Sequence, residues 1–199
     1  MFVFAALALA STVQPSPGLE LPPSALFASI PAAADADRPG FSYTYIEANY
    51  TRMEPDAADG HLDGFELTGS LGLPLGFFVQ ATDSQLNGDV DLNTYRVGGG
   101  WHFALGSTID AYGILSYVGQ NFDSGVSDED GVAADVGAKL AVTPKIELNG
   151  YVEWADVSES STGIGLGARY FLTDRLSLGL RGLFIDTGDE WAAGLRFQF

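Results

Sequence analysis

The chain has 199 residues, of which 46% are hydrophobic and 18% are charged, and its formal net charge is −17. This acidic excess argues strongly against nucleic-acid binding, because phosphates are held by lysine and arginine. The absence of cysteine excludes a disulfide framework and a thiolate metal site, and the high apolar and aromatic content argues against a disordered chain.

The N-terminal segment has the features of an export signal. Residues 2–10 (FVFAALALA) form the longest apolar run, which is too short for a membrane helix but typical of a secretory signal, although no Lys or Arg precedes it. Cleavage after Ala10 or Ala36 fits the small-residue rule. Residues 11–40 hold six of the nine prolines. We therefore predict a signal peptide or leader with a Pro-rich linker over residues 1–40, a disordered tail being the alternative, and one folded domain over residues 41–199.

From residue 41 onward the dominant hydrophobic period is two, which is the sign of β-strands. In residues 95–103, for example, Tyr95, Val97 and Trp101 alternate with Arg96, Gly98 and His102. The pattern predicts ten strands, over residues 41–52, 65–73, 75–82, 95–103, 107–120, 132–142, 146–154, 162–172, 176–184 and 190–199.

The connections between these segments alternate between two kinds. Short turns fall at residues 74–75, 105–107, 143–144 and 173–174, and longer acidic loops begin at Met53, Asp83, Asp123, Asp156 and Asp186. An up-and-down antiparallel meander would place every short turn at one end and every acidic loop at the other, which is the layout of an outer-membrane barrel with both termini periplasmic.

The aromatic residues distinguish a lipid-facing barrel from a soluble β-sandwich. On the apolar faces they fall near both ends of the strands, with Leu, Val, Ile, Ala and Gly between them, as membrane interfaces favour. The predicted interface set is Tyr50, Phe65, Trp101, Phe103, Tyr117, Trp154, Tyr170, Phe184, Trp191, Phe197 and Phe199.

The C-terminus, DEWAAGLRFQF, reads as a last strand that closes the barrel against the first. Gly194, Phe197 and Phe199 resemble the C-terminal targeting signal of outer-membrane barrels, although Ala192 stands where a polar residue is usual. With the alternation, this makes residues 41–199 similar to the small outer-membrane barrel proteins of the OmpX/OmpA type. Most of that group have eight strands, whereas ten are predicted for this chain, with eight as the alternative. The resemblance implies the barrel-assembly machinery as a partner during insertion.

Charges of both signs are predicted to face the lumen. They have two interpretations: a packed core of paired side chains, since buried charges need partners, or a narrow pore, since ten strands lie near the closed end of the range of barrel sizes. The predicted lumen residues are Glu47, Glu66, Arg96, Asp135, Lys139, Glu147, Glu153, Arg169, Arg181 and Arg196.

The acidic loops also have two interpretations. They form either a solvated outer rim or a site for Ca²⁺ or Mg²⁺, which prefer several oxygen ligands and could bridge to lipopolysaccharide phosphates. The candidate cation ligands are Asp89, Asp91, Asp128, Glu129 and Asp130. No resident cofactor is predicted.

Catalysis is the least supported function. His61 lies near Asp59 and Asp63, and His102 points inward, but no nucleophile, metalloprotease or phosphate-loop motif accompanies them. We therefore predict a monomeric, non-enzymatic barrel of the bacterial outer membrane. It would contact outer-membrane lipid and lipopolysaccharide and have a structural, adhesive or surface-interaction role. The alternative is a narrow, weakly cation-preferring, porin-like channel.

Overall fold

The computed structural model describes residues 41–55, 60–88, 91–122, 128–158 and 160–199. The predicted leader and linker, residues 1–40, lie outside the described residues. Within the described part of the chain, no helix is long and apolar enough to cross a membrane.

Ten β-strands and one short 3-10 helix, η3 (Pro74–Gly76), make up the regular structure of the described residues. The strands are β1 (Tyr45–Pro55), β2 (Leu62–Gly72), β3 (Phe77–Asn87), β4 (Leu92–Ala104), β5 (Ile109–Phe122), β6 (Glu129–Thr143), β7 (Ile146–Asp156), β8 (Ser160–Phe171), β9 (Leu176–Ile185) and β10 (Gly188–Gln198).

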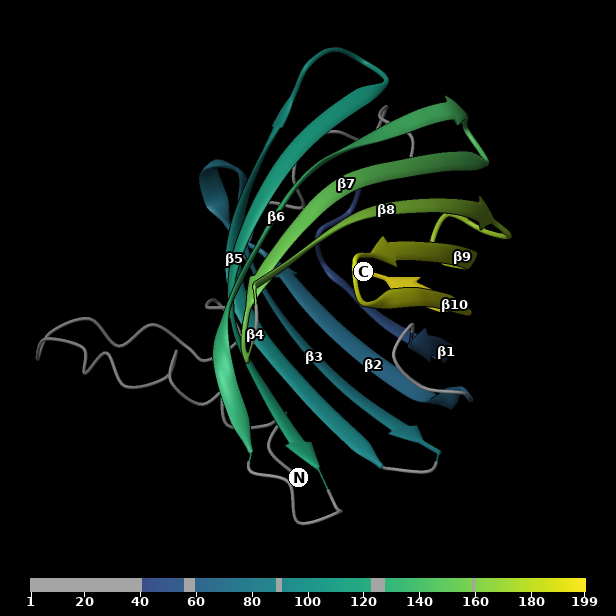
Figure 1. The fold of residues 1–199 in the computed structure, drawn as a ribbon. Coiled ribbons are helices and arrows are strands. Elements are labelled where there is room, and N and C mark those ends of the chain that lie inside the picture. The colour runs from purple at the N-terminus through teal and green to yellow at the C-terminus, as the bar shows by residue number, and fades with distance from the viewer. Residues whose placement is uncertain (1–40, 56–59, 89–90, 123–127, 159) are drawn as a thin grey trace, which may run out of the picture. The chain divides into compact units, whose positions relative to one another are not determined.

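The strands form one closed antiparallel barrel (Figure 1). Each strand pairs with its neighbours in the chain, and β10 pairs with β1 to close the sheet, with Gly194 opposite Asn49. Beyond β10, the N–H of Phe199 donates to the carbonyl of Thr44 at 3.1 Å. A closed sheet leaves no strand edge unpaired, and the predicted ten-strand up-and-down barrel is confirmed.

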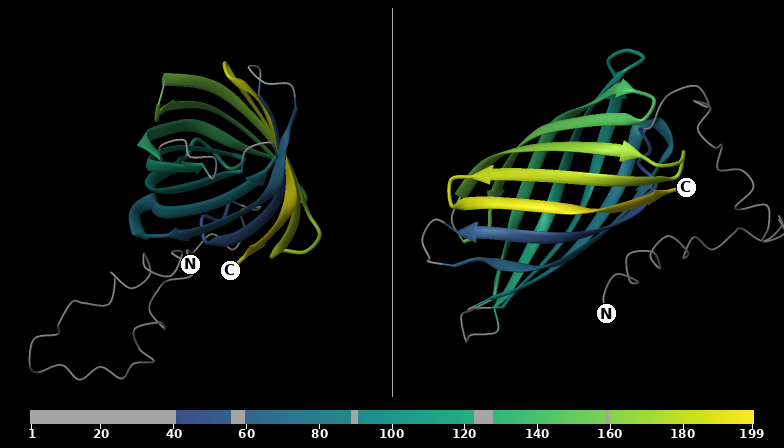
Figure 2. Two further views of the ribbon diagram at one scale, coloured as in Figure 1. Left: turned by 60° about the horizontal axis from the view of Figure 1, so that its bottom comes forward. Right: turned by 90° about the vertical axis from the view of Figure 1, so that its right-hand side faces the viewer.

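The connections lie at two distinct ends of the barrel (Figure 2). The turns that join β2 to β3, β4 to β5, β6 to β7 and β8 to β9 lie at one end, which we call the turn end. The strand ends that flank the other five connections lie at the opposite end, which we call the loop end. The start of β1 and the end of β10 are both at the turn end, because the register pairs Tyr45 with Gln198.

Successive side chains point alternately into and out of the barrel, as the pleat of a strand requires. On β1, Tyr45 and Asn49 are buried inside, whereas Ile46 and Tyr50 are exposed outside. All ten strands carry large apolar side chains on the outer surface. The barrel is therefore apolar outside and largely polar inside, the reverse of a water-soluble domain.

The predicted strand ends differ from those observed. The loop predicted to begin at Asp83 was wrong, because β3 continues to Asn87. Likewise β6 already begins at Glu129, and β10 at Gly188. At the turn end, β1 begins at Tyr45 and β3 at Phe77, later than predicted. At the loop end the outward side chains become polar, so the alternation that marks the lipid-facing part of each strand no longer identifies it.

Candidate functional site in the barrel lumen

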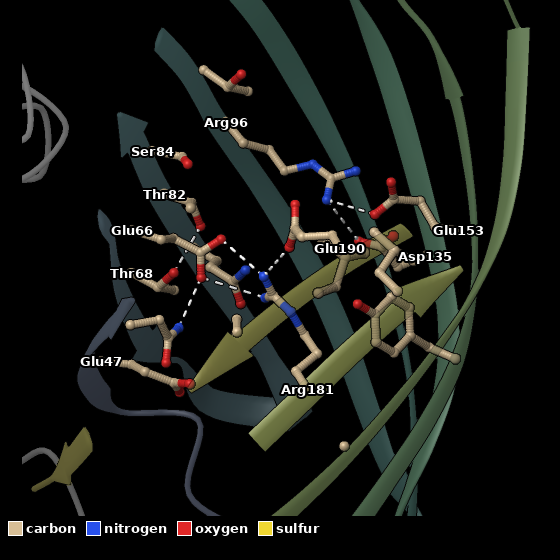
Figure 3. A pocket seen from close by; sticks show the side chains of 18 of the residues that line it. Glu47, Glu66, Thr68, Thr82, Ser84, Arg96, Asp135, Glu153, Arg181 and Glu190 are labelled. Carbon is tan, nitrogen blue, oxygen red and sulfur yellow. Dashed lines mark hydrogen bonds and ion pairs between the residues drawn. The ribbon is translucent and has the colours of Figure 1, made fainter. Parts of the chain in front are cut away.

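The lumen contains a cavity of about 590 Å³ lined by side chains from all ten strands. Figure 3 shows some of the residues that line it. Its lining extends from Phe78, near the turn end, to Leu92 and Thr187 at the loop end. Different kinds of side chain line the two ends and the middle of this cavity.

Aromatic rings fill part of the lumen at the turn end. Tyr43, from the segment before β1, is 6% exposed. Its ring packs on Phe78 at 4.6 Å and stacks on His102 at 4.0 Å between centroids, and Tyr112 belongs to the same buried cluster. Burial raises the pKa of the Tyr43 phenol well above its ordinary value, and the nearby Asp110 carboxylate raises it further. We call Tyr43, Phe78, His102 and Tyr112 the aromatic plug.

Charged groups surround the aromatic plug. The Nζ of Lys139 lies 3.8 Å from the centroid of the Tyr43 ring, which is a cation–π distance. Asp110 is 3% exposed. Its Oδ2 lies 3.0 Å from Nδ1 of His102, although without the geometry of a hydrogen bond. The plug is thus fixed by both stacking and charge.

Glu47 of β1 joins two arginines in the same half of the barrel. It accepts hydrogen bonds from Arg196 of β10 and, at 3.0 and 3.2 Å, from Nη2 of Arg169 of β8. Glu147 of β7 lies 3.9 Å from Arg169. The Arg196 guanidinium also lies 3.6 Å from the centroid of the Tyr45 ring. These contacts link strands β7, β8, β10 and β1 through the lumen.

Arg181 of β9 holds a second charged group, nearer the loop end (Figure 3). It donates to Glu66 of β2 at 3.1 Å and to Glu190 of β10 at 2.6 Å. Glu66 also accepts a hydrogen bond from the Asn49 side chain at 2.8 Å. Glu190, at the start of the last predicted strand, is therefore part of the lumen network.

Arg96 of β4 holds the third group on another part of the wall (Figure 3). It donates to Glu153 of β7 at 2.9 Å and lies 3.8 Å from Asp135 of β6. Asp135 is 7% exposed, and its Oδ1 accepts no hydrogen bond from the described residues.

The structure places all ten predicted lumen charges inside the barrel and adds Asp110 and Glu190, which the sequence interpretation missed. Position in the alternation would have identified both, since each shares a face with a predicted lumen residue of its strand or of its neighbour. Among these groups, carboxylates outnumber cations by seven to five. The carboxylates are Glu47, Glu66, Asp110, Asp135, Glu147, Glu153 and Glu190, and the cations are Arg96, Lys139, Arg169, Arg181 and Arg196.

At the loop end the lining of the cavity combines Ser84, Thr94, Gln120, Ser161 and Thr187 with a group of apolar side chains that the sequence interpretation also missed. We call this apolar group the apolar collar; it consists of Met53, Leu86, Leu92, Val118, Phe122, Ala155, Val157, Leu183 and Ile185. The outer surface at the same level is polar, with Arg52, Glu54, Asp63, Gln85, Asn87, Asn93, Asn121, Asp130, Asp156 and Asp189. The polarity of the wall therefore inverts at the loop end.

Below that level the exterior is mostly apolar, although Asp83 of β3 faces outward between Leu67 and Tyr95. Leu115 and Val136, for example, are 65% and 69% exposed. All eleven aromatic residues of the predicted interface set lie on the outer surface. A closed barrel with an apolar exterior satisfies its own backbone hydrogen bonds in hydrocarbon, as a membrane-spanning sheet must.

The predicted cation ligands do not converge in the described residues. Glu129 and Asp130 are neighbours on β6, so their side chains point to opposite faces. Asp89 lies outside the described residues, and among the residues that are described no group of three potential ligands comes together. Asp91 and Asp128 lie just before β4 and β6.

The two histidines lie in different environments. His61 is exposed, and its Nε2 lies 3.5 Å from Asp63 Oδ1. His102 belongs to the aromatic plug. Neither arrangement, as described, presents an activated nucleophile.

No protein-family model and no curated protein matches the sequence. Solved structures of similar fold include a KdgM porin, 11% identical, covering 77% of this chain and 99% of that one, with a TM-score of 0.47. The Ail attachment invasion locus protein of Yersinia pestis is 16% identical over 78% of this chain and 95% of its own, with a TM-score of 0.40. An outer membrane channel from Pseudomonas putida F1 is 10% identical over 82% and 98%, with a TM-score of 0.49. At this level of similarity no function is transferred from these proteins.

Proposed function

We propose that the chain is an integral barrel of the bacterial outer membrane with a structural or surface-interaction role, and that its lumen is closed to ions. The apolar exterior on all ten strands around an ion-paired interior supports the membrane assignment. In this proposal the turn end faces the periplasm and the loop end faces outward.

The observation that carries the closed state is the aromatic plug. Tyr43 lies before β1 in the chain, and its side chain points into the lumen, where it is 6% exposed. Its ring contacts Phe78, His102 and Lys139. The pairs around Glu47 occupy the same half of the barrel. A ten-strand barrel is close in size to the eight-strand barrels whose lumen is filled by side chains, so these groups leave little room for hydrated ions.

The second candidate is a narrow channel with a weak cation preference. The cavity of about 590 Å³ and the excess of carboxylates over cations in the lumen favour it. In that case the aromatic plug would have to move, since the cavity lining begins at Tyr43 and Phe78.

The proposed partners follow from the surfaces. The apolar belt would contact outer-membrane lipid, and the loop end would lie among lipopolysaccharide head groups, where loop carboxylates could share divalent cations. Gly194, Phe197 and Phe199 would be read by the barrel-assembly machinery. We propose a monomer without catalytic activity or resident cofactor and without a nucleic-acid partner.

Two measurements test the proposal. A folded barrel should require detergent for extraction and should migrate faster on a gel before boiling than after; a water-soluble monomer that needs no detergent would contradict the membrane assignment. In planar bilayers the purified chain should give no discrete openings. Regular openings with cation selectivity would contradict the closed lumen and support the channel instead.

A further inference from the structure

The apolar collar raises a question that the proposed function does not answer. The outer surface at its level is polar on most strands, although Phe184 lies between Leu183 and Ile185 on β9, so most of this part of the barrel stands in water rather than in hydrocarbon. In the part of a barrel that stands in water, apolar side chains on the inner face are expected to pack against one another and form a core. Here the collar residues line a cavity instead. Leu86 and Leu183 are 5% and 8% exposed, whereas Met53, Leu92 and Phe122 remain half-buried.

The charged groups of Arg96 and Arg181 form the floor below the collar. Glu153 and Ala155 are two residues apart on β7, and Arg181 and Leu183 are two residues apart on β9. Alternate residues of a strand share a face and lie about 7 Å apart. A molecule that enters the collar therefore meets the floor within a short distance.

The floor has an excess of negative charge. Its four carboxylates are Glu66, Asp135, Glu153 and Glu190, and they share the two guanidiniums of Arg96 and Arg181. One carboxylate oxygen, Oδ1 of Asp135, is buried and accepts no hydrogen bond from the described residues. Asp135 lines the cavity, so this oxygen is an acceptor for which the network supplies no donor.

The described loop-end rim is acidic as well. It carries Glu54, Asp63, Asp91, Asp128, Glu129, Asp130, Asp156, Asp186 and Asp189, against Arg52 and the imidazole of His61. A rim of one sign above a low-dielectric cavity raises the local concentration of the opposite charge.

From these features we propose that the loop-end half of the lumen binds a small amphipathic cation. Its apolar part lies against the collar, and its cationic end reaches the floor beside Asp135. The whole lumen cavity of about 590 Å³ is in the size range of small-molecule sites, and the proposed ligand occupies its loop-end part. This site goes beyond the proposed envelope role and does not depend on whether the lumen conducts ions.

Binding of hexylammonium, whose N–H groups can donate to Asp135, to the chain in lipid nanodiscs tests the site by calorimetry, with empty nanodiscs as the background. The proposal expects saturable binding that weakens at least about tenfold for methylammonium, which lacks the long alkyl chain, and for hexanoate, which reverses the charge. Absence of saturable binding above the background would overturn it. Equal binding of hexanoate or hexanol would overturn the assignment of a cation.

Variants locate the binding site. Ala155→Phe places a ring in the collar and should abolish binding, whereas Ala193→Phe, on the outer face of β10, should leave binding unchanged. Asp135→Asn should remove the preference for hexylammonium over hexanol. Each variant is first checked for fast migration before boiling. If folded Ala155→Phe or Asp135→Asn binds like the wild type, the site is not the one proposed. Because the readout is binding, failure here leaves the conductance test of the proposed function unaffected.

Discussion

Tyr43 and His102 stack inside the turn end of the barrel, with ring centroids 4.0 Å apart and planes inclined by 13°. Tyr43 comes from the four residues before β1, so the chain itself supplies the ring that obstructs the lumen. The stack places an aromatic ring where an open barrel would have water.

Removing this ring should open the turn end. Tyr43→Ala is expected to give discrete single-channel openings in planar bilayers and to lower the free energy of unfolding by about 3 kcal/mol, as for other large aromatic-to-alanine changes at buried sites. Tyr50→Ala, which removes an exposed ring from the outer surface of β1, is the matched control and should remain silent. A silent Tyr43→Ala barrel that is folded would show that other side chains close the lumen.

Glu47 should be among the most important charges for stability, because it is shared by Arg169 and Arg196. Glu47→Gln leaves two largely buried guanidiniums short of a counter-charge, which should cost about 3 kcal/mol or more. Urea unfolding of the chain in lipid vesicles measures this change. The exposed pair of Glu54 with Arg52 provides the comparison: Glu54→Gln should change the stability by less than about 1 kcal/mol. Equal effects of the two substitutions would contradict the described network.

The outer surface of β6 should be sensitive to charge. Val136 lies near the middle of this strand and is 69% exposed, so Val136→Arg should destabilise the barrel in a bilayer by about 2–4 kcal/mol. Asn121→Arg, on the polar loop-end surface of β5, should cost about 0–1 kcal/mol. Unfolding in vesicles compares the two. If Val136→Arg is as mild as Asn121→Arg, the belt is not in hydrocarbon.

Phe199 should matter more for assembly than for stability. Its ring contacts Phe197 with centroids 5.2 Å apart, and its N–H donates to Thr44 at 3.1 Å. That backbone bond does not need the side chain. Phe199→Ser should therefore lower the amount of folded barrel recovered from cell membranes several-fold while changing unfolding in vitro by less than about 1 kcal/mol. Phe103→Ser, an exposed ring at the same end, is the control. Equal recoveries would contradict a targeting role.

The sequence predicted the faces of the strands well where the outside is apolar. On β4, the alternation of Val97 and Trp101 with Arg96 and His102 is sufficient to assign each side chain to lipid or lumen, because only one side of the wall meets hydrocarbon. It also predicted ten strands, since each strand must carry its own alternation.

The partners within the lumen could not be predicted. Arg181 and Glu66 are 115 positions apart in the chain, and which carboxylate an arginine reaches depends on register and strand tilt. The loop-end strand segments were missed for a different reason: near Leu86 the outward residues Gln85 and Asn87 are polar, so the segment resembles a loop. Tyr43 was expected to belong to a strand, whereas β1 begins at Tyr45. The alternation with Glu47 places Tyr43 on the inward face, but its stacking on His102 of β4 could not be predicted.

The inversion of polarity at the loop end also fixes how deep the barrel can sit in a membrane. Sinking by one residue pair would draw Arg52, Asp63 and Asp189 toward hydrocarbon, and rising by one pair would lift Phe65, Trp154 and Trp191 into water. Both displacements are opposed on several strands around the circumference. The boundary between polar and apolar outer residues thus sets the depth of the barrel in the bilayer. A membrane whose hydrocarbon layer is thinner or thicker than the apolar band would have to deform to match it.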